Sequence, residues 1–161
     1  MKILVLAVGY PYRGDDAVGL EAVRYWMNEY PNTAKHPSIC VEFIETPIID
    51  LVRIFQKTDV IIIVDAVKGF KKPGDIYLIN DLNEFQTRHT YSGHGIGILE
   101  TINLMNILEP DTLPSEINFI GVEIASVEHG NELSPTLKSA IPTIAKSIEE
   151  LVQKYLIQIG G

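Results

Sequence analysis

Three residues far apart in the sequence have side chains that could together perform metal-assisted chemistry. Asp16 belongs to the stretch GYPYRGDDAVG, Asp65 interrupts the apolar run VIIIVDAV, and His94 lies between glycines in YSGHGIG. A carboxylate inside an apolar run is costly unless it is paired or metal-bound, so Asp65 favours a functional interpretation. Two carboxylates and one histidine that converge would form a three-ligand site with open coordination positions, the arrangement of metal sites that bind substrate.

Each of these residues also has a structural interpretation. Acidic side chains stabilise helix starts, and one acid suffices there, so Asp15 is assigned to the turn or helix start and Asp16 to the metal. Asp65 could accept a hydrogen bond from a neighbouring loop, and a lone histidine is more often structural or exposed. The joint pattern is therefore more informative than any single residue.

The ligand types leave the metal open. Imidazole suits nickel, zinc or iron, and carboxylates also suit manganese and magnesium. Among the other histidines, His36 is in a loop, His89 precedes His94 by five residues, and His129 follows the last predicted strand. His129 is the reserve ligand, because its loop should lie at the same edge of the sheet.

The elements that must position these residues alternate between strand and helix. This alternation predicts an α/β fold of three layers: a twisted, mostly parallel five-stranded sheet, with one antiparallel strand and helices on both faces. In such folds ligands bind at the carboxyl ends of the strands, where Asp16, Glu45 and Asp65 are expected. The predicted strands are 3–8, 40–45, 59–67, 75–80 and 116–124, and the predicted helices are 16–29, 48–56, 94–108 (helical beyond Gly97) and 134–156, the last with Ser134 as N-cap.

Composition limits the kind of protein. The 161 residues, 46% hydrophobic and 21% charged, are typical of one soluble domain spanning 1–161, with no membrane-spanning run and no signal peptide, which indicates a cytoplasmic location. A net charge of −8 without a basic cluster argues against nucleic-acid binding. The single cysteine, Cys40, lies in the apolar run ICVEF and is expected to be buried.

Several catalytic motifs are absent from the sequence. It contains no G-x-S-x-G elbow, no H-E-x-x-H and no P-loop pattern, and no G-x-G-x-x-G follows the first strand. A nucleotide-binding domain with Glu45 as ribose acceptor is therefore disfavoured, although the fold class would permit it.

Four segments in this order resemble the [NiFe]-hydrogenase maturation endopeptidases over nearly the whole chain. They are MKILVLAVGYPYRGDDAVG, VIIIVDAV, YSGHGIGILE and FIGVEIASVEHGNELSPTL. The resemblance implies that Asp16, Asp65 and His94 bind nickel, and that Asp16 or Asp65 serves as general base if one is needed, with no Ser or Cys nucleophile. One departure is Gly9–Tyr10, where the family commonly has Gly-Asn.

The implied activity is removal of a C-terminal extension from a hydrogenase large-subunit precursor, once nickel has been inserted. The nickel is carried by the precursor, so the isolated site could be empty or hold another divalent metal. The partner is that precursor, met by a monomer in a transient complex. The alternative is a non-catalytic module on the same fold that escorts a metal- or nucleotide-bearing partner.

Overall fold

The computed structural model describes residues 1–45, 51–69, 71–81, 84, 97–125 and 132–160. Its centre is a five-stranded sheet of order β2-β1-β3-β5-β4. Every neighbouring pair is parallel except β4 and β5, which are antiparallel. The strands are β1 (Ile3–Val8), β2 (Ile39–Ile44), β3 (Val60–Val67), β4 (Ile76–Ile79) and β5 (Glu116–Glu123).

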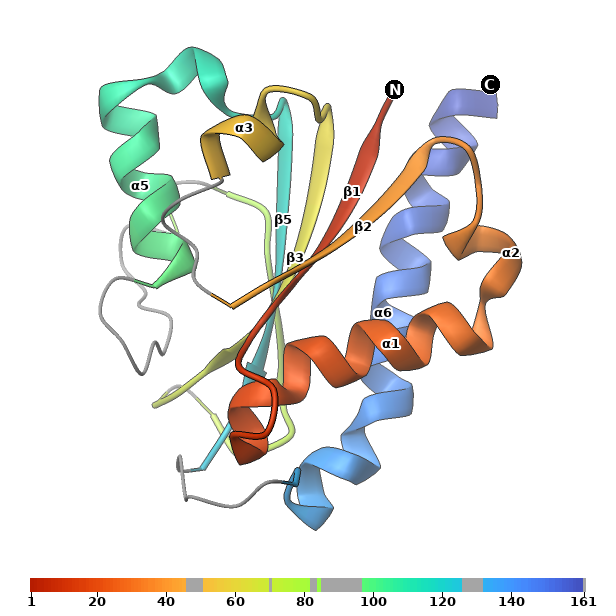
Figure 1. Ribbon diagram of the computed structural model, residues 1–161, viewed down its shortest axis with the longest axis vertical. Coiled ribbons are helices and arrows are strands. Elements are labelled where there is room, and N and C mark those ends of the chain that lie inside the picture. The colour runs from red at the N-terminus through yellow and green to blue at the C-terminus, as the bar shows by residue number, and fades with distance from the viewer. Residues whose placement is uncertain (46–50, 70, 82–83, 85–96, 126–131, 161) are drawn as a thin grey trace.

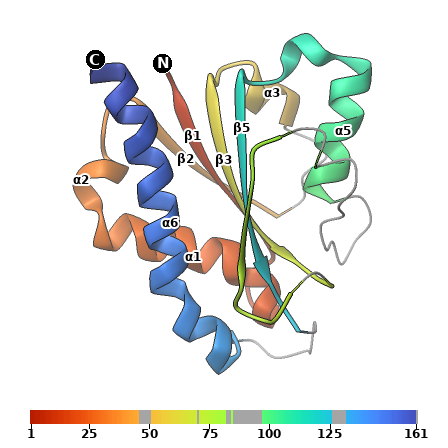
Figure 2. The same ribbon diagram turned by 180° about the vertical axis from the view of Figure 1, so that it is seen from behind.

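Helices cover both faces of this sheet, as Figures 1 and 2 show from opposite sides. One face carries α1, α2 and α6, and the other carries α3 and α5. The predicted fold class is thereby confirmed, and the antiparallel strand pairs with β5 rather than with β3, the strand before it in the sequence. The helical elements are η1 (Gly14–Ala17), α1 (Val18–Glu29), α2 (Pro31–Ala34), α3 (Leu51–Phe55), α5 (Ile98–Leu108), η2 (Pro110–Thr112) and α6 (Pro135–Gly160).

Strands β1 and β3 are buried along their whole length. Both are continuous apolar runs, as expected of parallel strands that are covered on two faces. Alternate residues of these strands face the α1–α6 core on one side and the α3–α5 core on the other. The strongest hydrophobic runs of the sequence therefore form the central strands of the sheet. The candidate site lies at the carboxyl ends of these strands.

Cys40 is exposed, so the prediction that it is buried is wrong. Strand β2 forms an edge of the sheet, and a hollow of about 190 Å³ separates it from α3. Cys40 lines that hollow. The apolar composition of ICVEF correctly indicated a strand, but it carries no information on the strand's lateral position.

The two long helices are joined by polar contacts as well as by the apolar core. The indole Nε1 of Trp26 on α1 donates to Glu149 Oε2 on α6 at 2.9 Å, and Thr33 Oγ1 donates to Glu149 Oε1 at 2.8 Å. At the start of α6, the backbone N–H of Leu137 donates to Ser134 Oγ at 3.4 Å, which confirms Ser134 as the N-cap. None of the helices in the described ranges combines the length and apolar character needed to cross a bilayer.

Candidate functional site

Asp65 is a buried acid in the centre of the sheet. Its side chain is 3% exposed, and it lies on the same face of β3 as Ile61, Ile63 and Val67. Pairing between β1 and β3 ends at Ala7 and Val64, so Asp65 is the first residue of β3 beyond this paired stretch. The position is therefore enclosed by the core and lies at the carboxyl edge where the loop after β1 departs.

Burial raises the pKa of the Asp65 carboxyl well above its ordinary value. The backbone N–H of Ala66 donates to Asp65 Oδ1 at 2.8 Å and opposes this rise, because it stabilises the charged form. The negative charges of Asp16 and Glu100 raise the pKa further. A proton or a cation at Asp65 would offset the cost of burying its charge and the repulsion from Asp16 and from Glu100.

Asp16 is held in the short 3-10 turn η1, between β1 and α1. It is 3% exposed, its backbone N–H donates to Arg13 O at 3.2 Å, and its charge acts on Asp65. The sequence predicted a helix from residue 16, whereas α1 begins at Val18 after this turn. The structure thus brings the first two predicted site residues to one edge of the sheet.

Two glycines permit this close arrangement. A Cβ on Gly9 would lie 2.5 Å from Asp16 O, and a Cβ on Gly19 would lie 2.5 Å from both Val8 O and Val64 O. The first turn of α1 therefore rests directly on the backbone of β1 and β3. This contact sets the height of η1, and with it the height of Asp16, above the sheet.

Tyr10, which departs from the family's usual asparagine, packs within the same loop. The Arg13 guanidinium lies 5.1 Å from the centre of its ring, a cation–π distance. The departure is thus accommodated by contacts inside the loop after β1.

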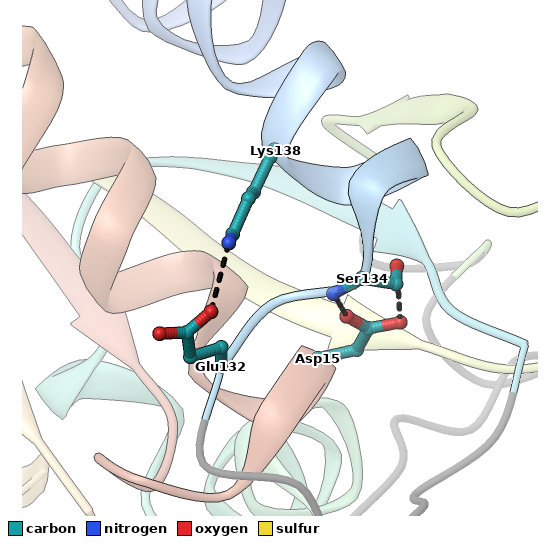
Figure 3. Close-up of polar contacts among 4 residues, drawn as sticks. All are labelled: Asp15, Glu132, Ser134 and Lys138. Atoms are coloured by element: carbon teal, nitrogen blue, oxygen red, sulfur yellow. Dashed lines mark hydrogen bonds and ion pairs between the residues drawn. The ribbon is translucent and has the colours of Figure 1, made fainter.

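Asp15 has a different role from its neighbour. Its Oδ1 accepts from the Ser134 backbone N–H at 2.7 Å and its Oδ2 accepts from Ser134 Oγ at 3.0 Å, as Figure 3 shows. Asp15 therefore joins η1 to the beginning of α6. The sequence predicted a structural role for Asp15, and the structure shows one, but the helix that Asp15 contacts is not the one that follows it, and metal binding by Asp16 stays a prediction.

We expect Asp15→Ala to lower the free energy of unfolding by about 1–3 kcal/mol, because it leaves the half-buried polar groups of Ser134 without their charged acceptor. In a double-mutant cycle with Ser134→Ala, the coupling energy should be about 1–2 kcal/mol. Urea denaturation of the four proteins measures both quantities.

The exposed ion pair between Lys138 and Glu132 provides the control for this cycle. Its Nζ–Oε2 distance is 3.0 Å and its side chains are 56% and 80% exposed, so a coupling of at most about 0.5 kcal/mol is expected. Equal coupling in the two cycles would contradict a special role for the Asp15–Ser134 contact.

Glu100 is an acid near the site that sequence reasoning missed. It is half-buried in the first turn of α5, close enough for its charge to raise the pKa of Asp65. The available signal was an acid six residues after His94, at the start of a predicted helix. That signal does not separate a site residue from an ordinary helix-start acid.

The remaining predicted residues are differently placed. His94, His89 and His129 lie outside the described residues, and Glu45 is exposed after β2. Within the described part of the chain, no three His, Cys, Asp or Glu side chains form a group that could hold a metal ion. Two buried carboxylates, one with a raised pKa, can hold a proton or contribute ligands to a cation, and the third ligand stays a prediction.

Comparisons with known proteins agree with this fold. Residues 37–151 match the family described as hydrogenase maturation protease, HycI, a range that contains Asp65 and position 94 and begins after Asp16. Protein FrxA from Pyrococcus furiosus is 29% identical over 143 residues, 88% of this chain and 98% of that protein.

Two solved structures illustrate the likeness. The [NiFe] hydrogenase maturation protease HybD from Thermococcus kodakarensis is 26% identical with a TM-score of 0.72, covering 94% of this chain and 99% of its own. The hydrogenase maturating endopeptidase HybD from E. coli is 23% identical with a TM-score of 0.73, over 96% and 94% of the two chains. The second match shows the shared fold.

Proposed function

This chain belongs to the hydrogenase maturation protease family, and from that premise we propose that it removes the C-terminal extension of a [NiFe]-hydrogenase large-subunit precursor after nickel insertion. Family membership supports a peptidase with a protein substrate. The cleavage position and the dependence on nickel belong to the proposal. We further propose that the enzyme is a cytoplasmic monomer that meets its precursor in a transient complex.

One observation carries the proposal beyond the family. Asp16 and Asp65 are both 3% exposed, come from separate elements at the carboxyl edge of the two central strands, and the charge of Asp16 acts on Asp65. A buried acid whose pKa is raised by burial and by a neighbouring acid is costly for a fold, and such groups are concentrated at functional sites. The pair supports a site that receives a cation, which here is the nickel that the precursor carries.

In the proposed reaction, Asp16, Asp65 and His94 contact the nickel of the precursor. The metal serves as a template that places the scissile bond beside the two carboxylates. Loss of the Asp65 proton on binding leaves a carboxylate that can accept a proton from the attacking water, and Asp16 is the second candidate for this role. Cys40 lies near the amino end of β2, at the other end of the strands, which agrees with a reaction without a cysteine nucleophile.

The test compares nickel-loaded with nickel-free precursor and measures the intact mass of the large subunit. We expect only the nickel-loaded form to be cleaved. Asp16→Asn and His94→Ala should each reduce the cleavage rate by about 10²-fold or more, because each removes a proposed contact to the cation or the reacting water. Asp111→Asn, an exposed acid of η2 beyond α5, should leave the rate unchanged.

Each alternative has its own result in this experiment. Equal cleavage of both precursors would reject recognition through nickel. A stable complex with a partner of unchanged mass would reject cleavage and favour the non-catalytic escort. Full activity of the Asp16 or His94 variant would reject the proposed site.

A further inference from the structure

A groove of about 730 Å³ lies beside the candidate site, on the side of the molecule that carries α1 and α6. The loop after β1, α1 and the beginning of α6 form its walls. Its volume falls within the range of pockets that bind ligands or short chain segments, about 300–1,000 Å³. Neither Asp16 nor Asp65, which we call the acid pair, lines the groove. The groove is therefore a separate feature.

The groove and the acid pair nevertheless share one wall, the turn η1. Gly14 and Ala17 line the groove, while Asp16, between them in the sequence, acts on Asp65. The turn is also joined to the start of α6 by the contact between Asp15 and Ser134. A chain lying in the groove would therefore be separated from the proposed cleavage position by a single turn of backbone.

The charges that line the groove are already balanced within the protein. Arg24 Nη1 lies 2.8 Å from Glu21 Oε1 on α1, and Lys138 Nζ lies 3.0 Å from Glu132 Oε2 across the start of α6 (Figure 3). The chain as a whole has a net charge of −8, but this groove presents each of its cations paired with an acid. Its electrostatics therefore suit an uncharged occupant.

The rest of the lining is mainly apolar and aromatic. Tyr12 and Tyr25 contribute aromatic surface, and Leu133, Ile141 and Pro142 contribute aliphatic surface. Aromatic and proline-lined grooves of this kind accept extended peptide segments.

Tyr12 is the most exposed large aromatic residue along this groove. Its side chain is 80% exposed, and its φ of 63° places it in the left-handed region, which non-glycine residues seldom adopt. The loop thus holds a large aromatic side chain in solvent by means of an uncommon backbone conformation. Exposed aromatic residues beside a groove are typical anchors of protein interfaces.

We propose that this groove is the docking site for an extended, uncharged and mainly apolar segment of the large-subunit precursor. The proposal rests on the proposed function for the identity of the partner. Charge balance, apolar lining and the wall shared with Asp16 favour a segment of the substrate over a charged ligand. Docking there adds a contact that is independent of the nickel.

The first test measures the kinetics of nickel-loaded precursor cleavage. Tyr12→Ala should raise KM at least tenfold and leave kcat within twofold, whereas Tyr12→Phe should behave like the unaltered protein. Ile157→Ala, which removes an exposed apolar side chain near the end of α6 outside the groove, serves as the control. An unchanged KM for Tyr12→Ala would overturn the proposal.

The second test does not depend on cleavage. A photoreactive benzoylphenylalanine at position 12 should cross-link to one contiguous, uncharged segment of the precursor, identified by mass spectrometry, and the same group at position 157 should not. Cross-links to a second copy of this chain, to a charged segment or to no segment would overturn the docking site. Absence of cleavage together with the expected cross-link would reject the proposed function alone.

Discussion

Asp65→Asn is expected to reduce cleavage of the nickel-loaded precursor by about 10³-fold, because an amide can neither accept the proton of water nor carry the negative charge that a cation requires. Asparagine has nearly the same shape, and its oxygen can keep the hydrogen bond from Ala66 N–H. The loss would therefore report the missing charge rather than a rearranged strand. A cleavage assay by intact mass measures the effect.

The same substitution should stabilise the metal-free protein. The folded state raises the pKa of Asp65 above its ordinary value of 3.8, first through burial and then through the charges of Asp16 and Glu100. The folded state consequently binds the proton more tightly than the unfolded state, and stability is lost as the pH rises from about 3.8 through the folded pKa. Asparagine has no such penalty.

The expected stability result is a difference that grows with pH. In the presence of a chelator, Asp65→Asn and the unaltered protein should unfold at similar temperatures near pH 4. At neutral pH the unfolding temperature of the variant should be higher by at least about 2–4 °C, the shift that corresponds to a gain in stability of about 1 kcal/mol. Asp111→Asn should follow the unaltered protein at every pH. A variant that is less stable at neutral pH would contradict the assignment of a strained acid.

Gly19→Ala is expected to lower the free energy of unfolding by about 3 kcal/mol or more, because the added methyl group overpacks a rigid contact. Its Cβ would lie 2.5 Å from two backbone oxygens, Val8 O and Val64 O, in the two central strands. Backbone in the middle of a sheet cannot move aside as a side chain can. Helix α1 would have to lift, and Asp16 would move with it.

A matched glycine provides the control. A Cβ on Gly160, at the end of α6, would meet no heavy atom within 4 Å, so Gly160→Ala should change stability by only about 0.5 kcal/mol. The ordinary effect of alanine inside a helix is stabilising, and a Gly19→Ala variant as stable as the unaltered protein would disprove the close approach. Urea denaturation of both variants measures the difference.

The centre of the fold could be predicted because its signals are local. Continuous apolar runs predicted strands at 3–8 and 59–67, and the structure has them at Ile3–Val8 and Val60–Val67. The order of the strands is not a local property. For that reason the pairing of β4 with β5 and the exposure of Cys40 at an edge could not be derived from the sequence.

Part of the geometry around the candidate residues could also be predicted, although their roles stay predictions. Asp65 was recognised because a carboxylate is conspicuous in an apolar run, and the comparison of two adjacent acids separated Asp15 from Asp16. The contact of Asp15 with a partner 119 residues away has no local signature in the sequence. The close packing of Gly19 against the sheet has none either, because glycine inside a helix usually indicates only a loss of stability. The part played by His94 stays a prediction.

The contacts between the ends of the chain also order events in time. During synthesis, Asp15 can bind Ser134 only after another 119 residues have been added. Trp26 can bind Glu149 only after another 123 residues. At a synthesis rate of about 5–20 residues per second, the first interval lasts about 6–24 s. The nascent chain can form much of its sheet during this interval, but the hydrogen bonds that join the turn of Asp15 and Asp16 to α6 form only after Ser134 has been made. Translation thus delays this support of the turn until synthesis has reached α6.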